Sequence, residues 1–366
     1  MTLAHTENPT ISVSKKQLVK ALKDYKKSAE LSNLSYVSDS DEGIKRIKSG
    51  ETYKYYFKNK KISDKKTLSR IQHLVIPPAW VNVWICADEN GHIQVTGYDA
   101  KNRKQYRYHS SWSIFRDQTK FFRIIDFANC ISTMRSRINE HLAQHINSKT
   151  KILAAVISIM ETTSIRVGNS IYEKLYASYG LSTLQDKHVK IIGDEVNFYF
   201  KGKKGIYHKI HFKSKKLAKI VSQCKDIPGK ELFQYYDEGG NKHTICSGEV
   251  NSYIREISGG DFTSKDFRTW NGTVKCLEAF IHLGFGENAS QNKKIMNEAI
   301  DMVASQLGNT RSVCKKHYIH PQILSHFETG VLNTYICNMS ETFKNKSECL
   351  LTDSEMILLK ILQRKI

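Results

Sequence analysis

The sequence predicts an α+β protein, with a small β-rich N-terminal domain followed by a mostly α-helical domain that contains a small β-hairpin sheet. Three observations support this class. Aromatic and β-branched runs bounded by turn residues come first, helical periodicity dominates after about residue 118, and one glycine-bounded hairpin signal interrupts the helices. We therefore expect a polar lead-in over residues 1–34, a β-rich domain over 35–117 and a mostly helical domain over 118–366.

The lead-in is rich in lysine, with the pairs Lys15-Lys16 and Lys26-Lys27, and is expected to be helical or loosely ordered. In the β-rich domain, residues 52–57 are aromatic and predict a strand. Residues 83–86 and 92–97 predict two further strands joined by a polar turn.

The helical domain has equally local signals. Five apolar residues share one face of a helix that should end near residues 161–164: Ile152, Leu153, Val156, Ile159 and Met160. Strand-like runs at 196–200 and 206–210 flank a glycine-containing turn, which predicts a hairpin. Helices are expected over residues 250–257 and about 290–306. A terminal helix should be capped by Thr352-Asp353-Ser354-Glu355.

Composition points to a polyanionic partner. The 366 residues include 56 Lys and Arg against 36 Asp and Glu, a net charge of +20, and phosphate contacts dominate the affinity of basic proteins for nucleic acids. No apolar run approaches the length of a membrane-spanning helix, and the N-terminus lacks the pattern of a secretory signal. The eight cysteines form no CxxC pair and are expected to be reduced thiols. We expect a cytoplasmic protein, associated with the nucleoid if it is bacterial.

Four blocks carry residues suited to phosphate chemistry. They are Ile165-Arg166-Val167-Gly168-Asn169, Phe200-Lys201-Gly202-Lys203, Lys265-Asp266-Phe267-Arg268-Thr269-Trp270, and Leu307-Gly308-Asn309-Thr310 followed by Lys315-Lys316-His317-Tyr318. Together they supply two arginines, a lysine, an amide and a phenol. A phenol among cations can attack a phosphate once its proton has somewhere to go.

In this order, the four blocks resemble those of the type IB DNA topoisomerases, in the compact poxvirus-like form found in bacteria. The resemblance covers roughly residues 35–330, including Pro77-Pro78-Ala79-Trp80 and Thr96-Gly97-Tyr98-Asp99-Ala100. It implies a monomeric enzyme that clamps double-stranded DNA, nicks one strand through a 3′-phosphotyrosyl intermediate and reseals it. ATP and a metal are not required, because exchanging a phosphodiester for a phosphotyrosyl ester conserves bond energy.

The resemblance assigns roles to the residues of the blocks. Tyr318 is the expected nucleophile. Arg166 and Arg268 are the expected clamp on the phosphate, since a guanidinium bonds two oxygens in a fixed fork.

Lys203 is the expected general acid for the departing 5′-oxygen, because a lysine among other cations can give up its proton. Lys204 is its rival by position, and only the Phe-x-Gly-Lys resemblance favours Lys203. Asn309 stands where many relatives carry histidine. An amide can donate a hydrogen bond to a phosphate oxygen but cannot titrate.

Further DNA contacts are expected from the segment Gln105-Tyr106-Arg107-Tyr108, and from Lys204 and Lys265. Strand alternation places Gln105 and Arg107 on one face and the two tyrosines on the other. A tyrosine pair facing the core of a sheet explains the same alternation equally well.

No metal site or cofactor is expected. Asp39-x-Asp41-Glu42 is interpreted as the acidic N-terminus of a helix rather than a ligand set, and no phosphate-binding GxxxxGK[ST] loop occurs. Two other functions stay open. A tyrosine recombinase shares the chemistry, although recombinases usually carry histidine where Lys265 stands. A basic nucleic-acid-binding protein that has lost its activity is the second.

Overall fold

The computed structural model describes residues 24–100, 102–144, 148–337 and 350–363. The Lys15-Lys16 pair and the rest of residues 1–23 lie outside the described residues, whereas Lys26-Lys27 belongs to a short helix, α2 (Tyr25–Leu31). The chain divides into two compact units, Met1–Phe122 and Arg123–Ile366. The domain division at residues 117 and 118 that the sequence predicts stays a prediction.

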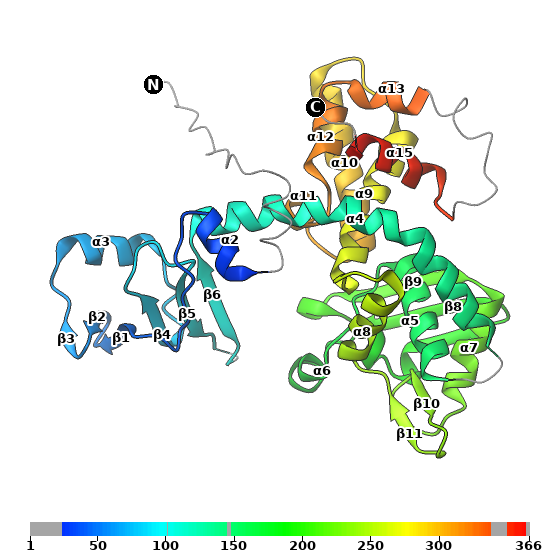
Figure 1. Cartoon of the computed structure of the whole chain (residues 1–366), viewed down its shortest axis with the longest axis horizontal. Coiled ribbons are helices and arrows are strands. Elements are labelled where there is room, and N and C mark those ends of the chain that lie inside the picture. Colours follow the sequence, from blue (N-terminus) through cyan, green and yellow to red (C-terminus); the bar gives the residue numbers. More distant parts are fainter. Residues whose placement is uncertain (1–23, 101, 145–147, 338–349, 364–366) are drawn as a thin grey trace. The chain divides into compact units, whose positions relative to one another are not determined.

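The first unit is built on a six-stranded antiparallel sheet with the strand order β3-β2-β1-β4-β5-β6 (Figure 1). Its strands are β1 (Gly43–Ser49), β2 (Thr52–Phe57), β3 (Lys60–Lys61), β4 (Val81–Cys86), β5 (Ile93–Tyr98) and β6 (Lys104–Tyr108). Helix α3 (Lys65–His73) contributes Ile71 to the core beneath the sheet, where it packs with Ile44, Val83, Ile85 and Val95. The strands predicted at 52–57, 83–86 and 92–97 are confirmed.

The helix expected after the acidic cluster at Asp39 is wrong, because β1 begins at Gly43. Contacts with residues far along the chain, rather than neighbouring residues, determine the structure of this segment. The carboxylate of Asp39 accepts a hydrogen bond from Thr96 and forms an ion pair with Lys104. Gly43 pairs with β4 so closely that a Cβ atom there would lie 2.1 Å from Nε1 of Trp84.

The second unit is mostly helical. A long helix, α4 (Ser110–Ala143), crosses the border between the units and begins before residue 118, earlier than expected. The other helices are α5 (Lys149–Thr163), α6 (Ser170–Tyr176), α7 (Lys215–Lys225), α8 (Ser247–Ser258), α9 (Ser264–Leu283), α10 (Ala289–Leu307), α11 (Arg311–His317), α12 (Pro321–Glu328), α13 (Val331–Cys337) and α15 (Asp353–Gln363).

A three-stranded antiparallel sheet lies in this unit, with the strands β7 (Val189–Ile192), β8 (Glu195–Lys201) and β9 (Tyr207–Lys213). Strands β8 and β9 form the predicted hairpin around a single turn of 3₁₀ helix, η3 (Lys203–Gly205). Two short strands, β10 (Gln234–Tyr236) and β11 (Lys242–Thr244), form a separate ribbon. The α+β class predicted from the sequence is confirmed.

The core of the second unit surrounds α5 and α9. The five residues predicted to share a face of α5 are all buried, and the helix ends at Thr163 as expected. The predicted cap of the terminal helix is also confirmed. The N–H of Thr352 donates to the carboxylate of Glu355 at 2.8 Å, and the N–H of Glu355 donates to Oγ1 of Thr352 at 3.3 Å.

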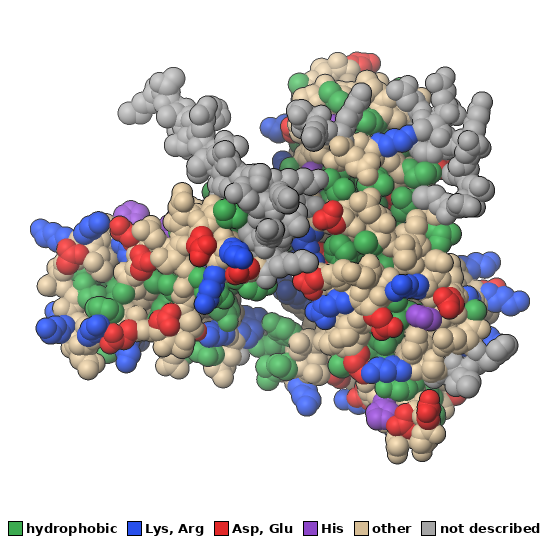
Figure 2. Space-filling model, viewed as in Figure 1, with side chains coloured by type: hydrophobic (Ala, Val, Ile, Leu, Met, Phe, Trp, Pro, Cys, Tyr) green, Lys and Arg blue, Asp and Glu red, His purple; other side chains and the backbone are tan. Residues whose placement is uncertain are grey.

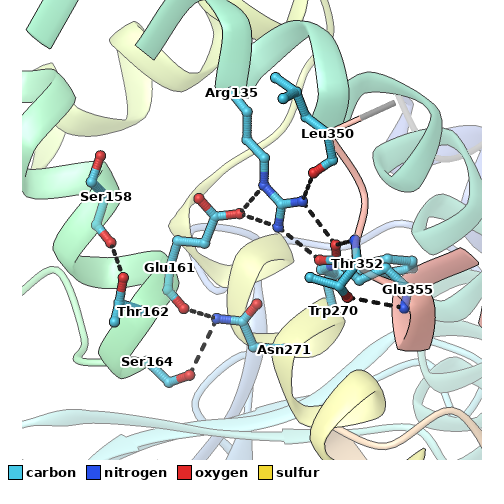
Figure 3. A network of polar contacts seen from close by, with 10 residues as sticks. All are labelled: Arg135, Ser158, Glu161, Thr162, Ser164, Trp270, Asn271, Leu350, Thr352 and Glu355. Carbon is cyan, nitrogen blue, oxygen red and sulfur yellow. Dashed lines mark hydrogen bonds and ion pairs between the residues drawn. The ribbon is translucent and has the colours of Figure 1, made fainter. Parts of the chain in front are cut away.

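A buried polar network joins four helices of this unit (Figure 3). Arg135 of α4 donates to Glu161 of α5 and to Glu355 of α15, each at 2.8 Å. Trp270 of α9 donates its indole N–H to the same Glu355 at 3.0 Å. Next to it, Asn271 donates to the backbone oxygen of Glu161 and to Oγ of Ser164, at 2.7 and 3.2 Å. The network therefore fixes the C-terminal end of α5 against α9.

Candidate active site

Arg268 lies on the buried face of α9 and is 5% exposed. Its guanidinium donates to two backbone oxygens, those of Ser164 and Leu307, where α5 and α10 end. Carbonyls at helix ends lack partners within their own helix, so a buried arginine can satisfy them. Arg268 therefore holds two helix ends together and is itself held in place.

Arg166 follows the end of α5, after Ser164 has turned the chain with a left-handed conformation (φ 57°). Its backbone oxygen accepts a hydrogen bond of 2.9 Å from Leu181. A Cβ atom at Gly180 would lie 2.5 Å from that oxygen, so only glycine permits this approach. The Arg166 side chain donates to Oδ1 of Asn309 at 2.5 Å.

Tyr318 lies in the short connection between α11 and α12, and its backbone packs against α9. Its backbone oxygen accepts a hydrogen bond of 3.2 Å from Oγ1 of Thr273. A Cβ atom at Gly272 would lie 2.7 Å from the same oxygen. Because Gly272 lies one turn after Arg268 on the helix, Tyr318 and Arg268 meet on one face of α9. The guanidinium carbon of Arg268 is 5.1 Å from the centre of the Tyr318 ring.

Asn309 is positioned by the end of α10. Gly308 adopts the left-handed conformation (φ 60°, ψ 51°), and the N–H of Asn309 returns to the carbonyl of Ala304 at 2.9 Å. This is a Schellman arrangement, which favours glycine at residue 308. It directs the Asn309 side chain toward Arg166.

The phenol of Tyr318 lies beside the guanidinium groups of both Arg166 and Arg268 and interacts with them electrostatically. Burial lowers the pKa of both arginines, and the phenol opposes this effect. For Arg268, burial and the nearby charge of Arg166 lower the pKa to about 10, so the side chain is still a cation at neutral pH.

Neither arginine has a carboxylate partner among the described residues, in contrast to Arg135, Arg255 and Arg311. Arg268 is buried and Arg166 is half-buried, so the two adjacent cations repel each other in poorly solvated surroundings, and a bound anion would relieve that repulsion. The site is therefore suited to an anionic ligand.

Two buried donors of the site also lack an acceptor within the described residues. They are Nε of Arg268 and Nδ2 of Asn309. The Asn309 side chain does interact with the thiol of Cys314, but sulfur is a weak acceptor. A buried N–H without a partner is costly, so both donors are consistent with an oxygen-rich ligand that completes the site.

The structure thus brings together four of the five predicted catalytic residues: Arg166, Arg268, Asn309 and Tyr318. The fifth, Lys203, is exposed at the tip of the β8–β9 hairpin together with Lys204, which has a left-handed backbone (φ 64°). No hydrogen bond or ion pair to another described residue holds either lysine. Lys265 is exposed in the first turn of α9.

The predicted DNA-contacting strand is β6 of the first unit. Tyr106 and Tyr108 are 44% and 46% exposed, with their rings stacked at 6.0 Å, so the alternative of a core-facing tyrosine pair is wrong. Gln105 and Arg107 lie on the opposite, partly buried side, where Gln105 donates to Asp99 at 2.9 Å. Nε of Arg107 is buried without a partner in the described part of the chain.

Sequence reasoning missed two contributors to the site, His208 and Gly272. His208 lies on β9, where burial and the charges of Arg166 and Arg268 lower its pKa. His208 lies against Gly202 and Gly308, and Gly272 lies against Tyr318. Apart from the contact with Gly202, these contacts join segments far apart in the chain, so no local pattern predicts them. The one available signal was a glycine where no turn needs it, as at Gly272 inside α9.

Basic and acidic side chains are intermixed on the face shown in Figure 2, so the net charge of +20 is not gathered into one patch there. Within the described residues, no group of three His, Cys, Asp or Glu side chains could hold a metal ion. None of the helices in the same residues is both long and apolar enough to cross a membrane.

Comparisons with known proteins identify the class. The family described as eukaryotic DNA topoisomerase I, catalytic core, matches residues 104–345, and the N-terminal domain of bacterial DNA topoisomerase IB matches residues 52–99. The chain belongs to the type IB DNA topoisomerases.

Among its relatives is DNA topoisomerase 1B of Acanthamoeba polyphaga mimivirus, 34% identical over 297 residues, which are 79% of this chain and 88% of the relative. DNA topoisomerase I of Monkeypox virus and DNA topoisomerase 1B of Vaccinia virus (strain Copenhagen) are each 25% identical over 276 residues. Those matches cover 73% of this chain and 84% of each relative.

Proposed function

We propose that this enzyme relaxes supercoiled duplex DNA by nicking one strand through Tyr318 and resealing it, without ATP or a required metal. The observation that carries the proposal is the pair Arg166 and Arg268, two cations without a carboxylate partner among the described residues that both lie beside the phenol of Tyr318. A phenol between two cations can act as a nucleophile toward a bound phosphate, because the cations hold the phosphate and stabilise its charge.

In the proposed reaction, the phenol oxygen of Tyr318 attacks the phosphorus and the bond to the 5′-oxygen breaks. The strand is left with a 3′-phosphotyrosyl ester and a free 5′-hydroxyl. The two arginines, with Asn309, would stabilise the charge that grows on the non-bridging oxygens. Lys203 would supply the proton of the leaving 5′-oxygen, and reversal of the same steps would reseal the strand.

Duplex DNA is the proposed partner of the whole chain, which we expect to act as a monomer in the cytoplasm, on the nucleoid if the source is bacterial. Gln105, Tyr106, Arg107 and Tyr108 of β6, with Lys204 and Lys265, are proposed to contact it. Exposed aromatic rings can contact bases or sugars, and exposed cations can contact phosphates.

A tyrosine recombinase is the alternative, and one feature weighs against it. Recombinases often exchange their C-terminal helix between subunits. Here α15 packs on α9 of its own chain, where Trp270 donates to Glu355.

The test is relaxation of a supercoiled plasmid that lacks any recombination site, in the presence of a chelator and without nucleotide. We expect relaxation and a covalent protein–DNA adduct that denaturant traps. Tyr318→Phe should bind DNA as wild type does but form no adduct, because only the attacking oxygen is lost. Relaxation by Tyr318→Phe at a rate near wild type would contradict the assignment of the nucleophile.

A further inference from the structure

The imidazole of His208 lies beside the arginine pair and has no role in the reaction as proposed above. It is on the inward face of β9, opposite Phe200 of β8, and the two rings stack at 5.1 Å with an angle of 19° between their planes. The hairpin that presents Lys203 therefore also presents this ring.

Two glycines from separate blocks of the sequence make room for the ring. A Cβ atom at Gly202 would lie 2.5 Å from Cδ2 of His208, and one at Gly308 would lie 2.2 Å from Cε1. Gly308 is also needed for its left-handed turn, but the φ of −95° at Gly202 suits any residue. The edge of the imidazole thus fits between the hairpin and the residue that precedes Asn309.

The ring nitrogens of His208 have unused hydrogen-bonding capacity. Neither nitrogen forms a hydrogen bond with another described residue, and neither is among the side-chain atoms sealed from solvent without a partner. Burial, Arg166 and Arg268 together lower the pKa of His208, so the imidazole is neutral at neutral pH. A neutral imidazole carries one N–H donor and one acceptor. Both remain available to a ligand that occupies the site.

We propose that His208 donates a hydrogen bond to a non-bridging oxygen of the phosphate that Tyr318 attacks. The imidazole would thus join the two arginines as a direct contact of the reacting group, in a site whose residue 309 is an amide. This inference rests on the proposed function and adds a catalytic residue to it. The competing explanation is that His208 only fills space between the two glycines.

Two variants separate these explanations. His208→Phe keeps a ring that can stack on Phe200 but removes both nitrogens. His211→Phe is the matched control, because His211 is exposed on the same strand, faces the other way and pairs with Glu195 at 3.4 Å. Cleavage sites of the wild type are first mapped from its covalent adduct. Single-turnover cleavage is then measured on a duplex with one such site.

We expect His208→Phe to cleave about 10²-fold more slowly than wild type, as for loss of one donor to a developing oxyanion, with unchanged DNA affinity and melting temperature. His211→Phe should cleave at the wild-type rate. The decisive readout uses substrates in which sulfur replaces either non-bridging oxygen. Sulfur accepts hydrogen bonds weakly, so one of the two diastereomers should slow the wild type but not slow His208→Phe further.

Should His208→Phe fold poorly, His208→Gln and His208→Leu replace it. The glutamine variant retains an N–H donor and should cleave faster than the leucine variant. The proposal is overturned if His208→Phe cleaves at the wild-type rate, or if it slows while keeping the full sulfur effect of the wild type. Failure of the proposed function looks different, because the wild type itself would then form no covalent adduct with DNA.

Discussion

Arg135 and Glu355, 220 positions apart in the chain, are joined by two hydrogen bonds of 2.8 Å between guanidinium and carboxylate. The side chain of Glu355 is 5% exposed and that of Arg135 is 20% exposed. The same guanidinium also bonds Glu161, which lies three residues before Ser164. Since the Ser164 carbonyl accepts from Arg268, the pair connects the C-terminal helix to the candidate active site.

Arg135→Met should destabilise the fold strongly, because it leaves the buried carboxylate of Glu355 and the half-buried carboxylate of Glu161 without their cation. We expect the free energy of unfolding to fall by about 3–5 kcal/mol, measured by urea denaturation. Glu42→Gln is the control, since Glu42 and Lys58 form an ion pair in which both side chains are more than half exposed. That change should cost at most about 1 kcal/mol. If the two variants lose equal free energy of unfolding, the network around Arg135 contributes no more to stability than an exposed ion pair does.

Glu355→Gln should change how stability depends on pH. Burial opposes the charged form of Glu355, but Arg135, the N–H of Thr352 and Trp270 outweigh it, so the pKa of Glu355 is lowered. Its carboxylate therefore stabilises the folded state above the unfolded pKa of about 4.3, and this contribution is lost as the pH falls through the folded pKa.

The stability advantage of wild type over Glu355→Gln should thus be constant near neutral pH and shrink as the solution is acidified below about pH 5. Burial raises the pKa of Glu161, which acts in the opposite sense. Glu161 is present in both proteins, so most of its effect cancels. An advantage that grows on acidification would be evidence against the lowered pKa.

Gly272→Ala should displace Tyr318, because the new Cβ would lie 2.7 Å from the Tyr318 carbonyl oxygen and 3.0 Å from its Cβ. A shift of the attacking group by about 1 Å can cost about 10²-fold in rate, and we expect a loss of that order in adduct formation. DNA affinity should be unchanged. Gly248→Ala on α8 is the control, where the nearest atom would be 3.6 Å away. Wild-type adduct formation by Gly272→Ala would disprove the close fit.

The sequence predicted the parts of the fold that local signals determine. The apolar face of α5, the hairpin around Lys203 and the cap formed by Thr352 and Glu355 each depend on residues close together in the chain. The prediction that the acidic cluster at Asp39 begins a helix was wrong. It used only neighbouring residues, whereas the contacts of Asp39 with Thr96 and Lys104, far along the chain, stabilise a different structure.

At the site, residue types and order predicted the contact of Arg166 and Arg268 with Tyr318. The fit of His208 against Gly308 could not be predicted in this way, because it exists only after the hairpin has packed against the end of α10.

The last prediction distinguishes Lys203 from Lys204, which are both exposed at the hairpin tip. If Lys203 protonates the leaving 5′-oxygen, Lys203→Ala should harm cleavage only when the leaving group needs a proton. A 5′-thiolate leaves without one, because its conjugate acid is far stronger than an alcohol. Lys203→Ala should therefore cleave ordinary DNA slowly and a 5′-bridging phosphorothiolate nearly as fast as wild type, in single-turnover assays.

Arg268→Ala is the control for this rescue. Its proposed role is to stabilise the non-bridging oxygens, which the phosphorothiolate leaves unchanged, so its cleavage should stay slow on both substrates. Selective rescue of Lys204→Ala in place of Lys203→Ala would assign the acid to the neighbouring lysine. If neither lysine variant is rescued, the hairpin grips the DNA backbone and the proton comes from another group.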